Sequence, residues 1–351
     1  MIHRLSIKDY LAFAESIPIV DVRTPLEFEQ GHIPGACNLP IFSNEERVQV
    51  GTCYKQCSRE EAILLGFDLV GTKWSGFIRQ VLKIAPSKRL VVHCWRGGMR
   101  SAAMAWVLQF YGFEVRVLEG GYKQYRRWVL DSFNETFSLL VLGGMTGSGK
   151  TALLSVLKNQ GEQVIDLEDL AQHRGSSYGS MGTLIQPTQE QFENDLAFAL
   201  QKMDLQKVIW IEDESITIGK RVIPHPLWQQ MRVTNLIKLL VPLEVRIQFL
   251  ADEYGELDKD FLITCTERIG KRLGPVQTKE ALLAIQENRI KDFTRLVLVY
   301  YDKTYQIGQS KRMPSSIYEV ECSSAHAVQN AASVIKLAQA IKEQHINSES
   351  V

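Results

Sequence analysis

Residues 138–151 read SLLVLGGMTGSGKT, a short apolar run that leads into a glycine-rich turn and a lysine. An apolar run of this length that ends in a turn is typical of a buried strand in a parallel sheet. The turn fits the pattern G-x4-G-K-[ST], which cradles phosphate groups when a strand precedes it and a helix follows. The stretch therefore predicts a parallel α/β domain, and its predicted diphosphate-binding residues are Gly144, Thr146, Gly147, Ser148, Gly149, Lys150 and Thr151.

Further polar residues are candidates for the same site. We expect Lys150 to contact terminal phosphates and the Thr151 hydroxyl to hold a Mg²⁺ ion. The run IWIEDES at 209–215 resembles an apolar strand that ends in carboxylates, so Glu212 or Asp213 is a candidate contact to the metal or its water. Asp166, at the end of its own predicted strand, is a further candidate contact to phosphate or to metal-bound water. Two alternatives stay open, because Glu212 and Asp213 also fit a solvated strand end and Asp166 also fits a helix cap. In the glycine-rich run at 173–179, Arg174 is a better candidate for a phosphate contact than His173.

A second anion-binding loop precedes the first along the chain. Residues 89–101 read RLVVHCWRGGMRS, which predicts a strand, a turn that presents Cys94, and a helix. Converging backbone N–H groups and guanidinium groups favour a thiolate and lower the pKa of a cysteine. We therefore predict that Cys94 is a nucleophile, and that it is surrounded by an anion site made of Arg96, Gly97, Gly98, Met99, Arg100 and Ser101.

The segment upstream of Cys94 strengthens this prediction. DVRTPLEFEQGHIPGACNLP at 21–40, taken with the cysteine loop, closely resembles the rhodanese family over residues 5 to 128. The loop is one residue wider than the usual rhodanese spacing. Its literal spacing, Cys94-x5-Arg100, also matches cysteine-dependent phosphatases, so phosphatase chemistry stays open at this loop.

The pattern along the chain predicts two α/β domains, 1–130 with a rhodanese-like fold and 131–351 with a P-loop NTPase-like fold, joined near a basic, aromatic segment. Predicted strands cover 17–22, 89–93, 114–118, 138–142, 163–166, 208–211 and 239–249. Predicted helices cover 101–111, a segment from Lys150, 188–203, 279–302 and 328–342.

Composition narrows the class of protein. The 351 residues are 45% hydrophobic and 23% charged, as in ordinary soluble proteins, and 40 basic residues balance 40 acidic ones. Any nucleic-acid contact therefore needs a local basic patch. The chain has no apolar run of about 18 residues and no signal-like start, which favours a cytoplasmic protein without a membrane span. Six scattered cysteines fit free thiols in a reducing compartment.

The two loops and several intervening runs occur in one order. CWRGGMRS, GGMTGSGKT, DLE at 166–168, HRGS at 173–176 and EDES at 212–215 together resemble the bacterial tRNA 2-selenouridine synthases over nearly the whole chain. This resemblance implies an enzyme that acts on 2-thiouridine at the wobble position of the tRNA anticodon loop. It implies transfer of a geranyl group from geranyl diphosphate, followed by replacement of the geranylated sulfur by selenium from selenophosphate.

The residues make chemical sense of that reaction. Alkylation turns the thiocarbonyl sulfur into a leaving group, the phosphate loop would hold the diphosphate, and Cys94 would attack selenophosphate to form a Cys–S–Se adduct. Selenophosphate synthetase is the implied supplier of selenium, and beyond Mg²⁺ no tightly bound cofactor is expected. Candidate tRNA contacts form two basic groups, the first beside Tyr122, Tyr125 and Trp128. These groups are Lys123, Arg126 and Arg127, and Arg268, Lys271 and Arg272.

Two other functions fit the same loops. One is a cysteine-dependent phosphatase fused to a P-loop kinase. The other is a rhodanese-like regulatory module whose second domain switches on nucleotide binding without covalent chemistry.

Overall fold

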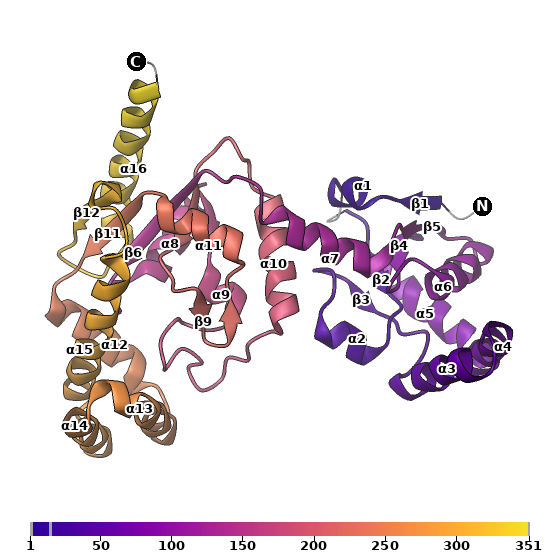
Figure 1. The fold of residues 1–351 in the computed structure, drawn as a ribbon, viewed down its shortest axis with the longest axis horizontal. Helices are drawn as coiled ribbons and strands as arrows, with labels where there is room; N and C mark the ends of the chain where they lie inside the picture. The colour runs from indigo at the N-terminus through magenta and orange to yellow at the C-terminus, as the bar shows by residue number, and fades with distance from the viewer. Residues whose placement is uncertain (1–2, 14–15, 350–351) are drawn as a thin grey trace. The chain divides into compact units, whose positions relative to one another are not determined.

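The computed structural model describes residues 3–13 and 16–349, with the side chains of 344–349 left out, and divides the chain into two compact units (Figure 1). The first unit contains the chain up to Phe133 together with residues 193–198, and the second contains Asn134–Phe192 and the chain from Ala199. Each unit is built around a five-stranded sheet in which all pairings are parallel. The predicted α/β fold class is therefore confirmed.

The first sheet has the strand order β1-β5-β4-β2-β3. Its strands are β1 (His3–Leu5), β2 (Ile19–Asp21), β3 (Cys37–Asn38), β4 (Arg89–His93) and β5 (Glu114–Leu118). The strands predicted at 89–93 and 114–118 are confirmed. Because parallel strands end at the same edge of a sheet, β2 and β4 bring Asp21 and His93 together directly before the cysteine loop.

The helices of the first unit are α1 (Ile7–Leu11), α2 (Pro25–Gln30), α3 (Asn44–Gln56), α4 (Arg59–Val70), the short 3-10 helix η1 (Gly71–Lys73), α5 (Trp74–Ile84), α6 (Met99–Phe110) and α7 (Gly121–Ser132). α3 starts at a capping box in which Ser43 and Glu46 satisfy each other's backbone N–H groups. The sequence patterns had assigned no element between β3 and β4, where α3, α4 and α5 lie. The segment expected to join the domains forms α7.

The second sheet has the order β12-β11-β6-β8-β7. Its strands are β6 (Leu139–Gly144), β7 (Gln163–Ile165), β8 (Ile209–Glu212), β11 (Leu236–Leu240) and β12 (Ile317–Glu321), and a separate hairpin pairs β9 (Thr217–Ile218) with β10 (Arg221–Val222). The chain leaves β6 towards β7 on one side and later returns to β11 on the other. Ligands of open α/β sheets bind at such a reversal of strand order, and the phosphate loop follows β6 directly.

The helices of the second unit are α8 (Lys150–Asn159), α9 (Leu167–Ala171), α10 (Gln189–Gln201), α11 (His225–Val233), α12 (Leu243–Gly255), α13 (Lys259–Leu273), α14 (Pro275–Gln286), α15 (Ile290–Gln309), the 3-10 helix η2 (Pro314–Ser316) and α16 (Ala327–Glu349). Three of them correspond to the predicted helices that start at Lys150, at 188 and at 328. The middle turn of α10, residues 193–198, belongs to the first unit.

Two predicted elements are wrong. The strand predicted at 239–249 is the end of β11 followed by α12, because Pro242 lacks the N–H that would continue the ladder and instead occupies the N-cap. The helix predicted at 279–302 is two helices, α14 and α15. Asn288 adopts a left-handed conformation with φ 62° between them, which ends α14.

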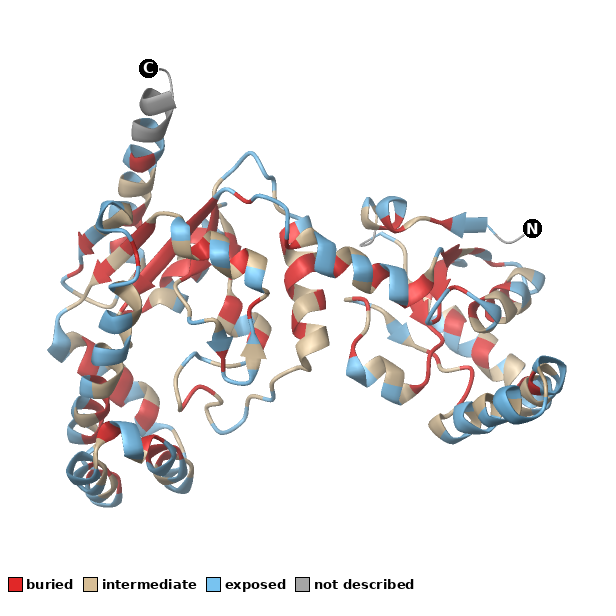
Figure 2. Cartoon of the chain, viewed as in Figure 1, coloured by how far each residue is buried: buried red, intermediate tan, exposed pale blue. Residues whose placement is uncertain are grey.

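The buried side chains gather on both sheets and in one helical cluster, and Figure 2 shows the central strands β6 and β8 of the second sheet as buried. Val92, Met104 and Val115 lie in the first core. Trp210 and Leu154 lie in the second. A third core consists of side chains from the helices α12, α13, α14 and α15 together with Tyr178. The two loops are therefore carried on rigid supports.

Candidate active sites

The cysteine loop joins the end of β4 to the start of α6. Cys94 is 4% exposed, and Gly97 has φ 64° in a place where a Cβ would come within 2.6 Å of the Leu118 carbonyl oxygen. The first turn of α7 forms two hydrogen bonds with the loop. The N–H of Tyr122 donates to the carbonyl of Cys94 at 2.9 Å, and the N–H of Lys123 donates to the carbonyl of Trp95 at 2.9 Å. The chain conformation around the sulfur is therefore fixed by backbone contacts.

Ser101 is the polar side chain next to the sulfur. Its Oγ lies 3.3 Å from Cys94 Sγ and 3.0 Å from the carbonyl oxygen of Gly98. A hydroxyl has one proton, so Ser101 donates either to Gly98 or to the sulfur. A thiolate at Cys94 would draw that proton to itself, which makes Ser101 a partner for the charged form.

The two arginines of the loop differ in their environment. Both Nη atoms of Arg100 donate to the carboxylate of Glu27, at 2.6 and 3.1 Å. Burial alone would raise the pKa of Glu27, but the hydrogen bonds and charge of Arg100 lower it to about 2. Arg96 is exposed and forms no ion pair within the described residues. Of the two predicted anion-binding guanidinium groups, Arg96 is the one whose charge is not neutralised by the protein.

A buried charged layer supports the loop. The guanidinium of Arg23 donates to Asp21 at 2.6 to 3.0 Å and lies 3.7 Å from the ring centre of Tyr122. His93 is fully buried, and its Nε2 lies 3.7 Å from an Asp21 carboxylate oxygen. Burial lowers the pKa of His93, which favours the neutral ring. Asp21 and Arg23, from the upstream signature, therefore act as supports and do not reach the sulfur.

A large cavity opens beside Cys94, and no motif in the sequence predicted it. Its volume is about 880 Å³, and its walls come from α3, α4 and the cysteine loop. Cys94, Trp95, Arg96, Gly98, Met99 and Arg100 line one side. A signal existed in the length of the segment between β3 and β4, which is too long for a simple connection.

The phosphate loop joins β6 to α8 as predicted. Gly147 and Gly149 have φ 80° and 76°, and a Cβ would lie 2.8 Å from Leu250 Cδ1 in the first case and 2.8 Å from the carbonyl oxygen of Ala325 in the second. The ammonium of Lys150 donates to the Gly144 carbonyl at 3.1 Å. The Ser148 hydroxyl is buried and has no hydrogen-bond partner in the described part of the chain. The loop thus holds polar groups that are available to a ligand.

Carboxylates lie around Thr151, and among them Glu212 is fully buried whereas Glu168 and Glu214 are half-buried. The Thr151 hydroxyl lies 3.2 Å from Glu168 and 3.4 Å from Glu212, and the N–H of Glu168 donates to Glu212 at 3.2 Å. Burial raises the pKa of Glu212 well above its ordinary value, and burial together with the charge of Glu168 raises the pKa of Glu214 to about 8. Such a cluster favours a bound cation or protons.

The other predicted phosphate or metal contacts have partners within the protein, and their roles at the site stay predictions. Asp166 caps α9 by accepting from Asp169 N at 2.9 Å. Asp213 pairs with Arg312 at 2.9 Å, because consecutive strand residues point to opposite faces and only Glu212 faces Thr151. Arg174 pairs with Glu253 at 2.5 Å. The sequence missed Glu168, whose position on the first turn of α9 was a usable signal.

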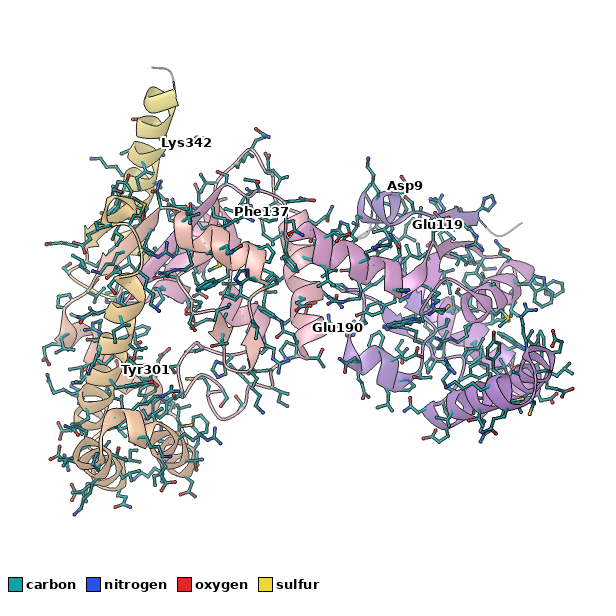
Figure 3. All side chains as sticks on the ribbon, in the orientation of Figure 1. Asp9, Glu119, Phe137, Glu190, Tyr301 and Lys342 are labelled. Atoms are coloured by element: carbon teal, nitrogen blue, oxygen red, sulfur yellow. The ribbon has the colours of Figure 1, made fainter. Side chains whose placement is uncertain are left out.

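The run at 173–179 lies against these carboxylates. A Cβ on Gly175 would come within 2.8 Å of Glu168 and 2.9 Å of Glu214, so the backbone approaches both side chains closely. The N–H of Ser177 donates at 3.0 Å to the hydroxyl of Tyr301, which Figure 3 labels on α15. Tyr178 is fully buried in the helical cluster. The hydrogen bond of Ser177 and the burial of Tyr178 therefore hold this run in place next to the two carboxylates.

The candidate RNA contacts are brought together only in part. Tyr122 and Tyr125 are fully buried and cannot stack on bases, which corrects that expectation. Arg126 donates to Glu193 at 2.5 Å and to Asn194 at 2.8 Å, whereas Lys123 and Arg127 are exposed. The second group lies on one face of α13 and is exposed; it consists of Arg268, Lys271 and Arg272.

Two families match the chain. Residues 137–334, more than half of it, match the family described as tRNA 2-selenouridine synthase AAA domain, and residues 6–127 match the rhodanese-like domain. A rhodanese-related protein of Thermoplasma volcanium aligns with 36% of this chain and 92% of its own, at 21% identity and a TM-score of 0.22.

Relatives with curated names match both units. A protein named tRNA 2-selenouridine synthase from Shewanella loihica is 34% identical over 89% of this chain and 92% of its own length. One of the same name from Nitrosomonas eutropha is 40% identical over 69% of this chain and 64% of its own length. The alignments with the Nitrosomonas relatives thus span just under two thirds of those proteins. Among the described residues, no helix has the length and apolar character needed to cross a membrane.

Proposed function

Because the chain belongs to the tRNA 2-selenouridine synthase family, we propose that it converts 2-thiouridine at the wobble position of tRNA into 2-selenouridine. The observation that carries this proposal is the presence in one chain of a nucleophile loop around Cys94 and a phosphate loop that ends in Lys150 and Thr151. The reaction then has two steps. Each unit of the protein supplies one of them.

In the first step the second unit binds geranyl diphosphate. The loop N–H groups, the Ser148 hydroxyl and Lys150 hold the diphosphate, and the sulfur of 2-thiouridine displaces it from the geranyl carbon. A cavity of about 650 Å³ beside Met145, walled in part by Leu239 and Pro242, gives the geranyl chain an apolar contact. Alkylation of the sulfur releases the N3 proton, and the carboxylates near Thr151 are the candidate acceptors.

Mg²⁺ fits the donors around Thr151. A hydroxyl and nearby carboxylate oxygens are ligands that this ion takes, directly or through water. No group of three His, Cys, Asp or Glu side chains among the described residues has the geometry of a metal site, so Thr151 and the diphosphate would supply the direct contacts. When bound, the ion neutralises charge on the departing diphosphate. Glu168 and Glu212 would orient its water shell.

In the second step Cys94 acts at carbon 2 of the geranylated base. We propose that its thiolate attacks this carbon and that geranylthiolate leaves with the bonding electron pair and takes up a proton. Selenium of selenophosphate then attacks the same carbon and Cys94 leaves as thiolate, while water takes the phosphoryl group. The sum is redox-neutral: geranylated nucleoside, selenophosphate and water give 2-selenouridine, geranylthiol and phosphate.

The Cys–S–Se adduct is the alternative route for Cys94. Attack of the thiolate on selenium would expel phosphorus with the bonding pair, as phosphite, and a thiol would later have to reduce the S–Se bond. The two routes differ in the phosphorus product. Phosphorus NMR of the reaction mixture separates them.

The proposed function is tested with tRNA that contains 2-thiouridine. Incubation with geranyl diphosphate and Mg²⁺ should add a geranyl mass to the digested nucleoside, and added selenophosphate should then give 2-selenouridine. If no geranyl mass appears and the protein hydrolyses an aryl phosphate, a cysteine-dependent phosphatase fused to a P-loop kinase replaces the proposed function. If ATP or GTP binds but neither geranyl transfer nor aryl phosphate hydrolysis occurs, the function as a nucleotide-switched regulatory module replaces the proposed one.

A further inference from the structure

The cavity beside Cys94 has an apolar floor. The buried or half-buried side chains of its wall include Ile41, Phe42, Val50, Ile63 and Trp74. Several large apolar side chains on the same wall are strongly exposed, among them Val48 at 66%, Phe67 at 58% and Met99 at 56%. A gathering of exposed apolar side chains around a cavity indicates a binding site more than a chance feature of the surface. The volume of about 880 Å³ lies in the usual range of ligand sites.

The same cavity carries only positive charge. Its charged lining residues are Arg47, Lys55, Arg59, Arg96 and Arg100, and no aspartate or glutamate lines it. Arg100 is neutralised by Glu27, whereas the other four form no ion pair within the described residues. A surface that is cationic and apolar at once is complementary to an anion that carries a hydrocarbon group. Polyphosphate chains without an apolar part would leave the floor unused.

We propose that this cavity receives the S-geranylated wobble nucleotide, with the geranyl chain on the apolar floor and the anticodon phosphates at the cationic rim. The inference rests on the proposed function, because that function requires the alkylated base to reach Cys94. The floor then decides the substrate of the second step. 2-Thiouridine without the chain lacks the apolar contact, so the Cys94 site selects the alkylated nucleotide and the order of the two steps is enforced.

The helix α4 offers a matched pair of residues for the test. Phe67 and Leu64 are each 58% exposed on α4, but Phe67 lines the cavity and Leu64 does not. The full-length variants Phe67→Asp and Leu64→Asp therefore carry the same charge on the same helix. Binding and selenation are measured with a synthetic anticodon stem-loop that contains S-geranyl-2-thiouridine. A stem-loop with S-methyl-2-thiouridine serves as the short-chain comparison.

We expect wild type and Leu64→Asp to bind the geranylated stem-loop at least tenfold more tightly than the methylated one. Phe67→Asp should raise the KM of selenation for the geranylated substrate about ten- to a hundredfold, the effect of losing one large apolar contact. It should also lose most of the preference for geranyl over methyl. The reversed-charge variant Arg59→Glu should weaken binding of both stem-loops alike.

Two results would overturn the inference. One is equal behaviour of Phe67→Asp and Leu64→Asp, and the other is a wild type that treats the geranylated and methylated stem-loops alike. Failure of the proposed function has a different signature, because wild type would then produce neither the geranylated nor the selenated nucleoside. If wild type selenates the supplied geranylated stem-loop but shows no preference for geranyl over methyl, only the proposed role of the cavity is disproved.

Discussion

Arg100 and Glu27 form a two-point ion pair, 2.6 and 3.1 Å long, between residues 73 positions apart in the sequence. Arg100 lies on the first turn of α6, which follows the cysteine loop, and Glu27 lies in the capping box of α2. The same carboxylate accepts from the N–H of Thr24 at 3.0 Å. One acidic side chain therefore joins the upstream signature to the helix behind Cys94.

This pair predicts a loss of stability in acid. The pKa of Glu27 is about 2 in the folded protein and 4.5 ordinarily, so its contribution is present above about pH 4.5 and is lost as pH falls through 2. The lowered pKa corresponds to at most about 3 kcal/mol. Solvent screening of this partly exposed pair reduces that to about 1–2 kcal/mol. Denaturant unfolding of Glu27→Gln at pH 7 should show this loss, and the difference from wild type should shrink towards pH 2.

Gly121 should be irreplaceable at the start of α7. It has φ 59°, and a Cβ there would overlap the Cys94 carbonyl and approach the Gly97 nitrogen. Gly121→Ala should lower the free energy of unfolding by several kcal/mol and disturb the cysteine loop. Gly35 is the matched control, with φ 80° and open space around its Cβ position, so Gly35→Ala should cost only about 1 kcal/mol. Equal effects of the two substitutions would contradict the contact.

Cys94→Ser should separate the two steps. The variant keeps a hydroxyl that is a far weaker nucleophile than a thiolate, so selenation should fall below detection while geranyl transfer continues. In wild type the phosphorus product of selenation should be phosphate. Phosphite among the products, or selenium transfer by the variant, would contradict the role given to Cys94.

Lys150→Ala should impair the first step of the proposed reaction, which is geranyl transfer. Loss of its charge from the phosphate loop should slow geranyl transfer about a hundredfold or more. Selenation of a pre-geranylated stem-loop should persist. Lys158→Ala, which removes an exposed charge from the same helix, is the control and should alkylate normally. Normal alkylation by Lys150→Ala would place the diphosphate elsewhere.

The carboxylate cluster predicts a loss of stability towards alkaline pH. The pKa of Glu214 is raised from 4.5 to about 8, so its protonated form stabilises the fold below about pH 4.5 and this contribution is lost as pH rises through 8. Glu214→Gln should melt at a higher temperature than wild type at pH 8 and at a similar one at pH 4.5. The exposed Glu256→Gln is the control. Mg²⁺ with inorganic diphosphate should raise the melting temperature of wild type at pH 8 more than at pH 5.

Local sequence was enough for both loops and for the strands that carry them. β4 and β5 lie where the apolar runs predicted, and the glycines at 97, 147 and 149 occupy left-handed conformations where a side chain would collide with its surroundings. These features depend on neighbours in the chain. The wrong predictions arose where one residue outweighed the general pattern, as Pro242 does at the end of β11 and Asn288 does between α14 and α15.

Partners far apart in the chain were beyond the reach of sequence patterns. Periodicity does not reveal that Glu212 faces Thr151 while Asp213 pairs with Arg312. Nor does it reveal that Arg126 forms an ion pair with Glu193. It also does not reveal that α3 and α4 leave an apolar and cationic cavity beside Cys94. The sequence alone determined the two anion-binding loops and the family, because strand, turn and helix signals are local. Only the tertiary structure decided which charges remain free at those loops, because ion pairs and cavities form between segments that the fold brings together.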